Sequence, residues 1–252
     1  MKIALVYGGQ PRFTYDFLDL MTKITGFESA SFYIVLWKTD WADTDQKAHA
    51  RLSKILKSPY SIGKITVVDE PIVNAPAGNG HLESARPENV MWWYTRQYRQ
   101  TKGLSLAFDL IDQEYDAVIR FRGDGSVNTL IDLSKIDLKN TPLILPNNAK
   151  SGHDYMKVND QFAIGNYNMM KFYCGIGKEY ESLVPQSDPL WNKTNQRHPN
   201  WKWGAEHLMG YRFAKYNVIP TTGNFGITLN SYGRSKFTDK HFHHSIARDP
   251  TE

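Results

Sequence analysis

Short apolar runs alternate along the chain with longer segments in which apolar residues recur every three or four positions. A short apolar run between polar or glycine residues is typical of a buried strand, and the longer spacing indicates an amphipathic helix. The sequence therefore predicts strands over 2–7, 31–37, 65–68, 117–119, 143–145, 158–165, 218–220 and 225–229. It predicts helices from residue 14 or 16 to about 24, and over 43–57, 88–112, 168–173 and 204–216.

The predicted strands and helices alternate, which favours an α/β fold: a mixed, mostly parallel sheet flanked by helices. No internal repeat, low-complexity stretch or linker divides the chain, so we expect a single domain. Gly103 leaves open whether the helix over 88–112 is continuous. Residues 74–87 contain Pro, Gly and Asn without periodicity, and are expected to form a loop.

The composition is that of a globular protein, with 252 residues of which 41% are hydrophobic and 22% charged. The single cysteine, Cys174, excludes an intrachain disulfide and fits a reducing compartment. No apolar run approaches the roughly 18 residues of a membrane span. The run from Ile3 to Tyr7 is too short for the core of a signal peptide. We therefore expect a soluble, cytoplasmic protein without a transmembrane segment.

The net charge of +4 makes the chain mildly basic. Such a charge suits a polyanionic ligand, for example a nucleoside diphosphate. The sequence lacks the lysine-rich runs that are typical of nucleic-acid-binding proteins. We therefore expect a small anionic ligand and no nucleic acid partner.

The candidate chemistry centres on residues 120–125, Arg-Phe-Arg-Gly-Asp-Gly, which follow the predicted strand over 117–119. Ligands of α/β sheets gather at the carboxyl ends of the strands. Glycines on both sides of Asp124 leave room for a ligand or a metal ion beside its carboxylate. Arg120 and Arg122 add two permanent cations suited to phosphate oxygens. The alternative is a solvated turn, because Gly-Asp-Gly is common in turns.

The first predicted strand also ends in a sequence suited to ligand binding, Gly8-Gly9-Gln10-Pro11-Arg12. Two glycines followed by an arginine indicate a loop pressed against a ligand. The third glycine of the dinucleotide-binding fingerprint is missing, which argues against that motif.

Two further segments are rich in aromatic residues. The helix predicted over 88–112 carries Arg96 among tryptophans and tyrosines, and Arg96 is either a contact to the ligand or a solvated cation. The polar segment over 185–203 carries Trp191, Trp201 and Trp203. Their indoles could stack on the sugar rings of an acceptor, or they could anchor the loop itself.

The order of these motifs resembles bacterial and viral glycosyltransferases of the GT-A fold, most of all the group linked to lipopolysaccharide and capsular glycan synthesis. The resemblance covers about residues 1–220. It rests on a set of short pieces: Gly9-Gln10-Pro11-Arg12, Trp37, Tyr115-Asp116 with Arg120-Phe121-Arg122-Gly123-Asp124, Asp160-Gln161-Phe162-Ala163-Ile164-Gly165, and Ala205-Glu206 with Leu208. It implies a single GT-A-like domain over 1–230, with a nucleotide-binding half at about 1–128 and an acceptor half at about 129–230. Residues 231–252 would form a basic, histidine-containing tail, a candidate lid over the site.

The resemblance also assigns roles to individual residues. The nucleotide-sugar donor would be held by a basic, glycine-containing set: Gly8, Gly9, Gln10, Arg12, Arg96, Arg120 and Arg122. Asp124 would stand for the last aspartate of the Asp-x-Asp signature, which binds a divalent metal ion on the donor diphosphate. Asp160 would face the donor sugar or the acceptor, and Glu206 would be the catalytic base or an acceptor-binding carboxylate.

The sequence departs from that signature at its first aspartate, where Arg122 stands. One protein carboxylate can suffice for Mg²⁺ or Mn²⁺, because these ions also bind phosphate oxygens and water. The arginine could instead neutralise the leaving diphosphate directly. We favour Mn²⁺ or Mg²⁺ held mainly by Asp124 and the diphosphate, with His243 of the tail as a further candidate ligand.

The sequence thus predicts a glycosyltransferase that moves a sugar from a nucleotide-sugar donor to a hydroxyl of a glycan or another acceptor. Two alternatives stay open: a non-catalytic module that binds sugars or nucleotides, and a nucleotidyltransferase with a similar sheet. A nucleotidyltransferase would carry a glycine-rich, basic loop after its first strand, and residues 8–12 match that loop only faintly. Slow hydrolysis of the donor without acceptor would distinguish a transferase from a binding module.

Overall fold

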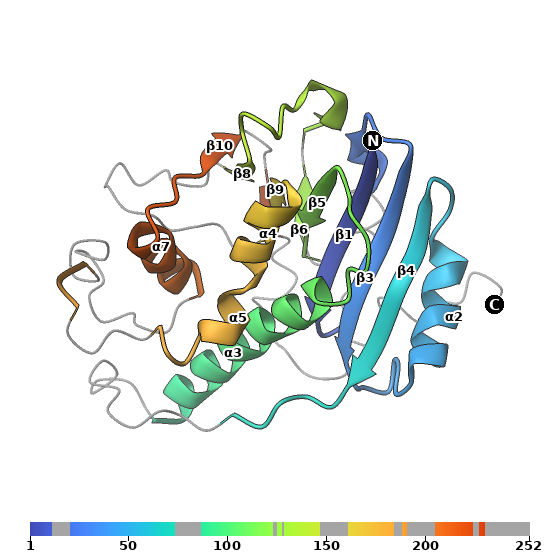
Figure 1. The fold of residues 1–252 in the computed structure, drawn as a ribbon. Coiled ribbons are helices and arrows are strands. Elements are labelled where there is room, and N and C mark those ends of the chain that lie inside the picture. The colour runs from blue at the N-terminus through green and yellow to red at the C-terminus, as the bar shows by residue number, and fades with distance from the viewer. Residues whose placement is uncertain are drawn as a thin grey trace.

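The computed structural model describes residues 1–11, 21–73, 87–122, 125–127, 129–146, 161–183, 188–190, 205–223 and 227–229. At its centre lies a seven-stranded sheet with the strand order β10-β8-β9-β5-β1-β3-β4 (Figure 1). The strands are β1 (Lys2–Gly9), β3 (Ser29–Trp37), β4 (Tyr60–Val68), β5 (Ala117–Arg120), β8 (Leu143–Pro146), β9 (Ala163–Gly165) and β10 (Thr221–Gly223). Strand β9 runs antiparallel to both of its neighbours, and the other pairs in this sheet are parallel. The predicted α/β fold with a mixed, mostly parallel sheet is confirmed.

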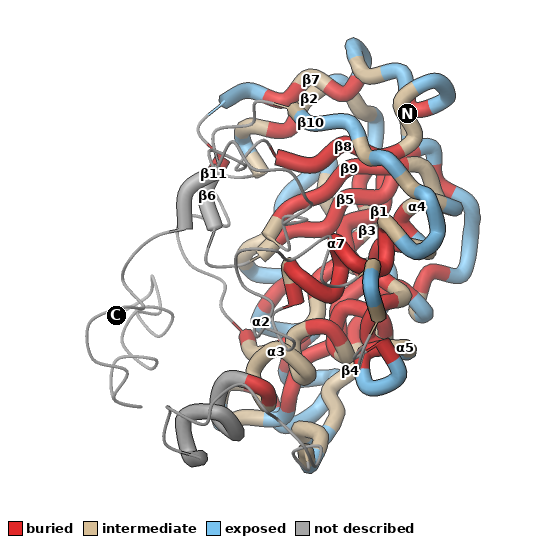
Figure 2. Tube along the Cα trace, turned by 90° about the vertical axis from the view of Figure 1, so that its left-hand side faces the viewer, coloured by how far each residue is buried: buried red, intermediate tan, exposed pale blue. Residues whose placement is uncertain are grey.

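Helices cover both faces of the sheet. They are α2 (Asp45–Ile55), α3 (Pro87–Phe108), α4 (Tyr167–Cys174), α5 (Ile176–Glu179) and α7 (Ala205–Lys215). Helices α3, α4, α5 and α7 share one core with alternate strand residues such as Val6 and Val118. Helix α2 shares the other core with the intervening residues, such as Leu5 and Ile119. Figure 2 shows the buried residues concentrated along the central strands. Burial on both faces explains why β1 and β3 are nearly continuous apolar runs.

Local sequence signals explain where two of the helices begin. The Thr44 hydroxyl accepts a hydrogen bond from the backbone N–H of Lys47 (3.3 Å) at the start of α2. The Asn166 side chain accepts one from the N–H of Met169 (3.0 Å) at the start of α4. Both caps satisfy N–H groups that have no partner inside the helix.

The structure corrects the predicted elements at several positions. Helix α3 runs unbroken through Gly103 and ends at Phe108, short of residue 112. Ile24 was expected to end a helix and instead lies in β2 (Ile24–Thr25), which pairs in parallel with β7 (Ile131–Asp132). The strand predicted over 218–220 is wrong, because these residues are irregular and the strand begins at Thr221.

Several short elements carry no clear signal in the sequence. They are β2, β7, α5, the 3₁₀ helix η1 (Leu133–Lys135), and β6 (Gly125–Val127), which pairs antiparallel with β11 (Ile227–Leu229). The loop predicted over 74–87 lies outside the described residues except for Pro87, which begins α3. The tail over 231–252 also lies outside them. Among the helices described, none is long and apolar enough to cross a membrane.

Candidate functional site

Strands β1, β3, β4 and β5 are parallel and end at one edge of the sheet, which we call the carboxyl edge. Ligands of open α/β sheets bind at this edge. Because β9 runs antiparallel, the residues that precede it reach the same edge. The described segments there are 10–11 after β1, 38–40 after β3, 69–70 after β4, 121–122 after β5 and 161–162 before β9.

The loop after β1 is held against the end of β5. Val6 lies opposite Arg120 in the parallel pair, so Gln10 and Arg122 follow neighbouring strand ends. The Tyr7 hydroxyl donates a hydrogen bond to the carbonyl oxygen of Gln10. The Tyr7 ring packs on Phe121 with 5.4 Å between the ring centroids. The two segments that the sequence analysis assigned to the donor are therefore brought together.

The two glycines that end β1 have different surroundings. A Cβ atom on Gly8 would lie 2.1 Å from the carbonyl carbon of Gly103, because α3 crosses β1 at this point. This close approach is a packing reason for Gly8 that requires no ligand. Gly9 has a φ of 133°, which residues with a side chain rarely adopt, and a Cβ there would lie 3.9 Å from Nε1 of Trp37. Gly9 is thus the glycine that shapes the loop at the carboxyl edge.

The two arginines at the end of β5 differ in exposure. Arg120 is 3% exposed, and its Nη1 donates a hydrogen bond to the carbonyl oxygen of Gln161 (2.8 Å). Arg122 lies two residues further along and is partly exposed. One cation is therefore enclosed beside β9, and the other is accessible at the tip of the strand.

The N-terminal half of α3 borders the carboxyl edge. Gly103, in the C-terminal half of the helix, packs on Gly8 at the end of β1, so the residues before Gly103 extend along the edge. Arg99 ties this half of the helix to the end of β4. Its Nη1 lies 3.0 Å from Oε1 of Glu70, and its Nε donates to the carbonyl oxygen of Pro71 at 3.3 Å. Arg99 is thus paired within the protein. The predicted ligand contact in this helix is Arg96, three residues earlier.

Helix α7 begins against α3. The backbone N–H of Ala205 donates a hydrogen bond to Oε1 of Gln97 (3.1 Å), so a side chain of α3 caps α7. Glu206 is the next residue, and Arg96 is the neighbour of Gln97 in the chain. Both Glu206 and Arg96 are partly buried. The structure therefore brings two predicted site residues to one junction between helices.

Other predicted site residues lie outside the described residues: Arg12, Asp124, Asp160, Trp191, Trp201, Trp203 and His243. Within the described ranges, no group of three His, Cys, Asp or Glu residues could hold a metal ion. Glu70 lies at the carboxyl edge, but its carboxylate pairs with Arg99. The described residues therefore do not supply a metal site, and ligation by Asp124 and His243 stays a prediction.

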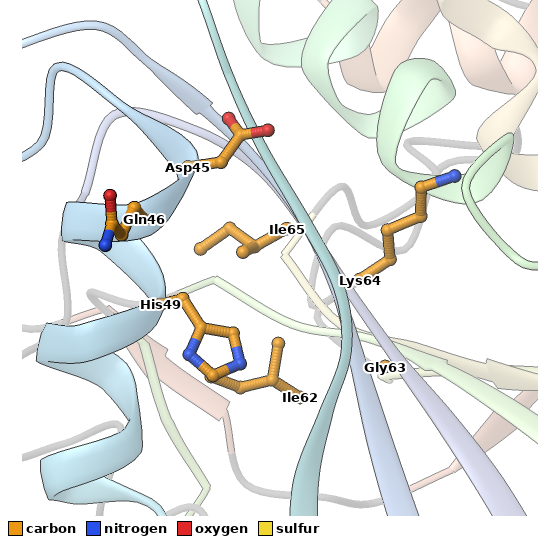
Figure 3. Close-up of a pocket in the computed structure, with 7 residues that line it drawn as sticks. All are labelled: Asp45, Gln46, His49, Ile62, Gly63, Lys64 and Ile65. Carbon is orange, nitrogen blue, oxygen red and sulfur yellow. The ribbon is translucent and has the colours of Figure 1, made fainter.

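Two pockets in the described part of the chain lie away from the carboxyl edge. The first, of about 370 Å³, lies between α2 and β4, where Asp45 and His49 face Ile62 and Ile65, while Lys64 points away from the helix (Figure 3). The second, of about 360 Å³, is lined by residues of α3, α4, α5 and α7. No residue that the sequence analysis proposed for the site lines either pocket.

The second pocket is lined in part by the salt bridge between Arg212 and Glu179. Nε and Nη2 of Arg212 lie 3.1 and 2.6 Å from the two carboxylate oxygens of Glu179. These bonds hold the pKa of Glu179 below its usual range, against the smaller opposing effect of burial. The Arg212 guanidinium also lies 4.0 Å from the ring centre of Phe172. This cluster joins α4, α5 and α7, and its charges are satisfied internally.

Sequence reasoning missed the residues that hold the edge together. In the sequence, Tyr7 is one residue of an apolar strand run. No sequence motif indicates the hydrogen bond from its hydroxyl to Gln10. Gln97 and Arg99 lie in the helix predicted over 88–112, but their partners, Ala205 and Glu70, are distant in the chain. No local pattern could have identified these three contacts.

No protein-family model matches the sequence, and a search of curated proteins found no significant match. A search of solved structures found a likeness to the glycosyltransferase GlyE of Streptococcus pneumoniae TIGR4, at 11% sequence identity and a TM-score of 0.45. The aligned region covers 89% of this chain and 46% of the GlyE chain, so this chain spans just under half the length of that protein. A likeness at this identity and TM-score does not assign a function to this chain.

Proposed function

We propose that this chain is a glycosyltransferase of the GT-A type that moves a sugar from a nucleotide-sugar donor to a hydroxyl of a glycan or another acceptor. The observation that carries the proposal is the parallel pairing of β1 with β5, which places Gln10 and Arg122 at neighbouring strand ends. A loop shaped by Gly9 beside an accessible arginine suits a nucleoside diphosphate. The motif order described above supports the same reaction class.

The reaction makes three demands on the residues of the site. As the acceptor oxygen bonds to the anomeric carbon, the bond to the diphosphate breaks and negative charge develops on the leaving group. Arg122 and Arg12 would stabilise that charge. A carboxylate, Glu206 or Asp160, would take the proton of the acceptor hydroxyl. The segments over 74–87 and 231–252 would cover the site and exclude water, which would otherwise hydrolyse the donor.

The remaining basic and aromatic residues would position the substrates. Gly8, Gly9 and Gln10 would lie along the nucleotide, and Arg96 and Arg120 would be further basic contacts to the nucleotide-sugar donor as a whole. Trp191, Trp201 and Trp203 would stack on sugar rings of the acceptor. These assignments follow the motif order, and Gly8 also has its packing contact with Gly103.

We further propose that Mn²⁺ or Mg²⁺ accompanies the donor, with Asp124 and His243 as its protein ligands. When bound, such an ion would neutralise charge on the diphosphate. Asp124 follows Arg122 closely in sequence, so both would act on the same phosphate groups. The products would belong to surface glycans of the lipopolysaccharide or capsule type. A cytoplasmic location is part of the proposal, and the single cysteine, Cys174, supports it.

The proposal is tested by screening a panel of nucleotide sugars for thermal stabilisation of the protein, with and without Mn²⁺. A ligand present at about 100 times its Kd adds about 2.7 kcal/mol of stability, which gives a clear shift in Tm. The best donor is then incubated alone, and the release of nucleoside diphosphate is measured. We expect slow hydrolysis. Binding without any turnover would favour a non-catalytic module, and the absence of binding across the panel would contradict the proposal.

A further inference from the structure

Two arginines are buried among the residues that the structure describes, and their surroundings differ sharply. Arg212 is 6% exposed, and its guanidinium is bonded to both carboxylate oxygens of Glu179. Arg120 is 3% exposed, and its one hydrogen bond goes from Nη1 to the carbonyl oxygen of Gln161. The Nε of Arg120 is buried without a partner, and no carboxylate within the described ranges pairs with this side chain.

The guanidinium of Arg120 reaches toward the carboxyl edge. In the antiparallel pair of β5 and β9, Arg120 lies opposite Ala163. Its hydrogen bond goes instead to Gln161, which lies two residues before Ala163 and so just beyond the start of β9, on the side of the carboxyl edge. The guanidinium therefore extends toward the carboxyl edge, between the end of β5 and the residues that precede β9.

The same side chain lies on the face of the sheet that α3 and α4 cover. Val118, two residues earlier in β5, belongs to the core shared with these helices. The charge of Arg120 also acts on the thiol of Cys174 at the end of α4. Burial raises the pKa of that thiol, and the positive charge of Arg120 opposes the rise. The guanidinium is thus enclosed between the edge of the sheet and the helices.

The described residues supply no anion for this arginine. The guanidinium has five N–H donors and stays charged at every physiological pH. A buried charge is normally paired and hydrogen-bonded, because otherwise its removal from water is uncompensated. A carbonyl oxygen satisfies one donor and provides no opposite charge. An oxyanion from a ligand could accept from the remaining donors in the bidentate geometry that arginine favours.

The position of Arg120 indicates which part of a substrate would supply the oxyanion, an inference that rests on the proposed function. The leaving diphosphate is assigned to the accessible Arg122 and to Arg12. Arg120 lies two residues behind that tip and beside Gln161, the residue after Asp160, which is assigned to the donor sugar. We propose that Arg120 binds a carboxylate of the donor sugar, so that the substrate is a nucleotide-linked acidic sugar of the uronic acid class.

The test compares matched donors that differ only in this carboxylate. Binding to the full chain is measured by calorimetry for UDP-glucuronate against UDP-glucose, for GDP-mannuronate against GDP-mannose, and for free UDP and GDP. In one of these pairs, the wild type should bind the acidic nucleotide sugar at least about tenfold more tightly than the neutral one. A site that pairs with a polar group of its ligand rejects an analogue that lacks the group. In Arg120→Met this preference should fall to about twofold or less, with unchanged affinity for the free nucleoside diphosphate.

Stability measurements separate binding from a structural role. Without ligand, Arg120→Met should have a Tm equal to or above that of the wild type, because an unpaired buried charge has been removed. Arg212→Met is the matched control and should have a lower Tm, because it leaves Glu179 without its partner. If Arg120→Met fails to fold, Arg120→Lys decides, since it keeps the charge and loses the bidentate geometry.

The outcomes bear differently on the two proposals. Equal binding of acidic and neutral sugars by the wild type would overturn the acidic-sugar inference and leave the glycosyltransferase proposal standing. A loss of free UDP or GDP affinity in Arg120→Met that matches the loss for the acidic sugar would show that Arg120 binds the diphosphate, which overturns the inference. Failure of the wild type to bind any of these nucleotides would overturn both.

Discussion

Gly8 and Gly103 pack backbone against backbone where α3 crosses the end of β1. A Cβ atom on Gly8 would lie 2.1 Å from the carbonyl carbon of Gly103, and one on Gly103 would lie 2.9 Å from the carbonyl carbon of Gly8. Both distances are shorter than real Cβ contacts, and the opposing atoms belong to the backbone. This contact fixes where α3 lies over β1, and so determines how far its N-terminal half projects along the carboxyl edge.

The first prediction follows from this contact. Gly8→Ala should lower the free energy of unfolding by about 1–3 kcal/mol, because an added methyl group forces a strand and a helix apart in a packed core. Urea unfolding measures the loss. Ala50→Ser adds one atom on the exposed side of α2 and should change stability by less than about 0.5 kcal/mol. An unchanged midpoint for Gly8→Ala would contradict the close packing.

The second prediction concerns the hydroxyl of Tyr7. Tyr7→Phe removes the hydrogen bond to Gln10 and keeps the ring on Phe121. It should cost about 1 kcal/mol of stability, and under the proposed function it should also weaken nucleotide binding, because the loop after β1 is released. The control is Tyr60→Phe. It removes a hydrogen bond from the Tyr60 hydroxyl to the carbonyl oxygen of Met21 (2.6 Å), and neither residue belongs to the loop after β1. It should cost similar stability without changing nucleotide affinity, and equal effects of both variants on binding would refute the role of Tyr7.

The sequence predicts those parts of the fold whose signal is local. The runs that became β1 and β3 are apolar because both faces are covered, and the helix over 45–55 follows a capping threonine. It does not predict the pairing of β2 with β7, because two-residue strands carry no periodicity and Ile24 meets Ile131 only through the tertiary fold. Ile24 also fits the apolar spacing of the helix predicted from residue 14 or 16, which explains why residue 24 was assigned to that helix.

For the candidate site as well, the sequence predicts what local signals carry and misses what depends on the tertiary fold. The sequence indicated Gly9 and the arginines after residue 119 as ligand-binding residues, because they directly follow predicted strands. It could not show that Arg120 is enclosed whereas Arg122 is accessible, since exposure depends on β9 and on helices from the second half. Nor could it show the contact of Gly8 with Gly103, which belongs to packing and which the sequence analysis attributed to a ligand.

The third prediction is a pH dependence of stability at the salt bridge of Arg212 with Glu179. The folded protein lowers the pKa of Glu179, mainly through the hydrogen bonds from Arg212. The stabilisation is therefore present above the usual pKa of a glutamate and is lost as the pH falls through the lowered folded value. Glu179→Gln should cost about 1–2 kcal/mol near neutral pH, a moderate figure because the Glu179 side chain is 34% exposed.

Unfolding in urea at about pH 6 and about pH 3 measures this effect, since the difference between wild type and Glu179→Gln should shrink at the lower pH. Asp109→Asn is the control. Its partner Lys178 lies 2.7 Å away, but both side chains are about half exposed, so the loss should stay below about 1 kcal/mol. A difference for Glu179→Gln that is the same at both pH values would show that its carboxylate charge is not the cause.

The fourth prediction concerns donor use. Asp124→Asn keeps the size of the side chain and removes its charge, so turnover should fall by about a hundredfold or more if a metal ion supplies several kcal/mol of leaving-group stabilisation. The control is Asp137→Asn, because the Asp137 carboxylate accepts bonds from the N–H groups of Lys139 and Asn140 within its own turn. It should leave turnover unchanged. Near-normal turnover of Asp124→Asn would remove Asp124 from the site.

The last prediction distinguishes the two carboxylates proposed for the acceptor side, Glu206 and Asp160. Glu206 lies in the first turn of α7, and the cap from Gln97 to Ala205 holds this end of the helix against α3, so a rigid element carries its carboxylate. The motif order assigns Glu206 to the acceptor. Asp160 is the residue assigned to the donor sugar. We therefore expect Glu206 to be the base.

The test is kinetic. Glu206→Gln should lower kcat by about a hundredfold or more, should bind the donor normally, and should lose the acidic limb of the pH–rate profile. Asp160→Asn should mainly weaken donor binding, because its carboxylate would accept hydrogen bonds from sugar hydroxyls. Glu181→Gln, an exposed carboxylate beyond α5, is the control and should leave both quantities unchanged. If Asp160→Asn loses the acidic limb instead, the two roles are exchanged, and full turnover in both amide variants would show that neither carboxylate is the base.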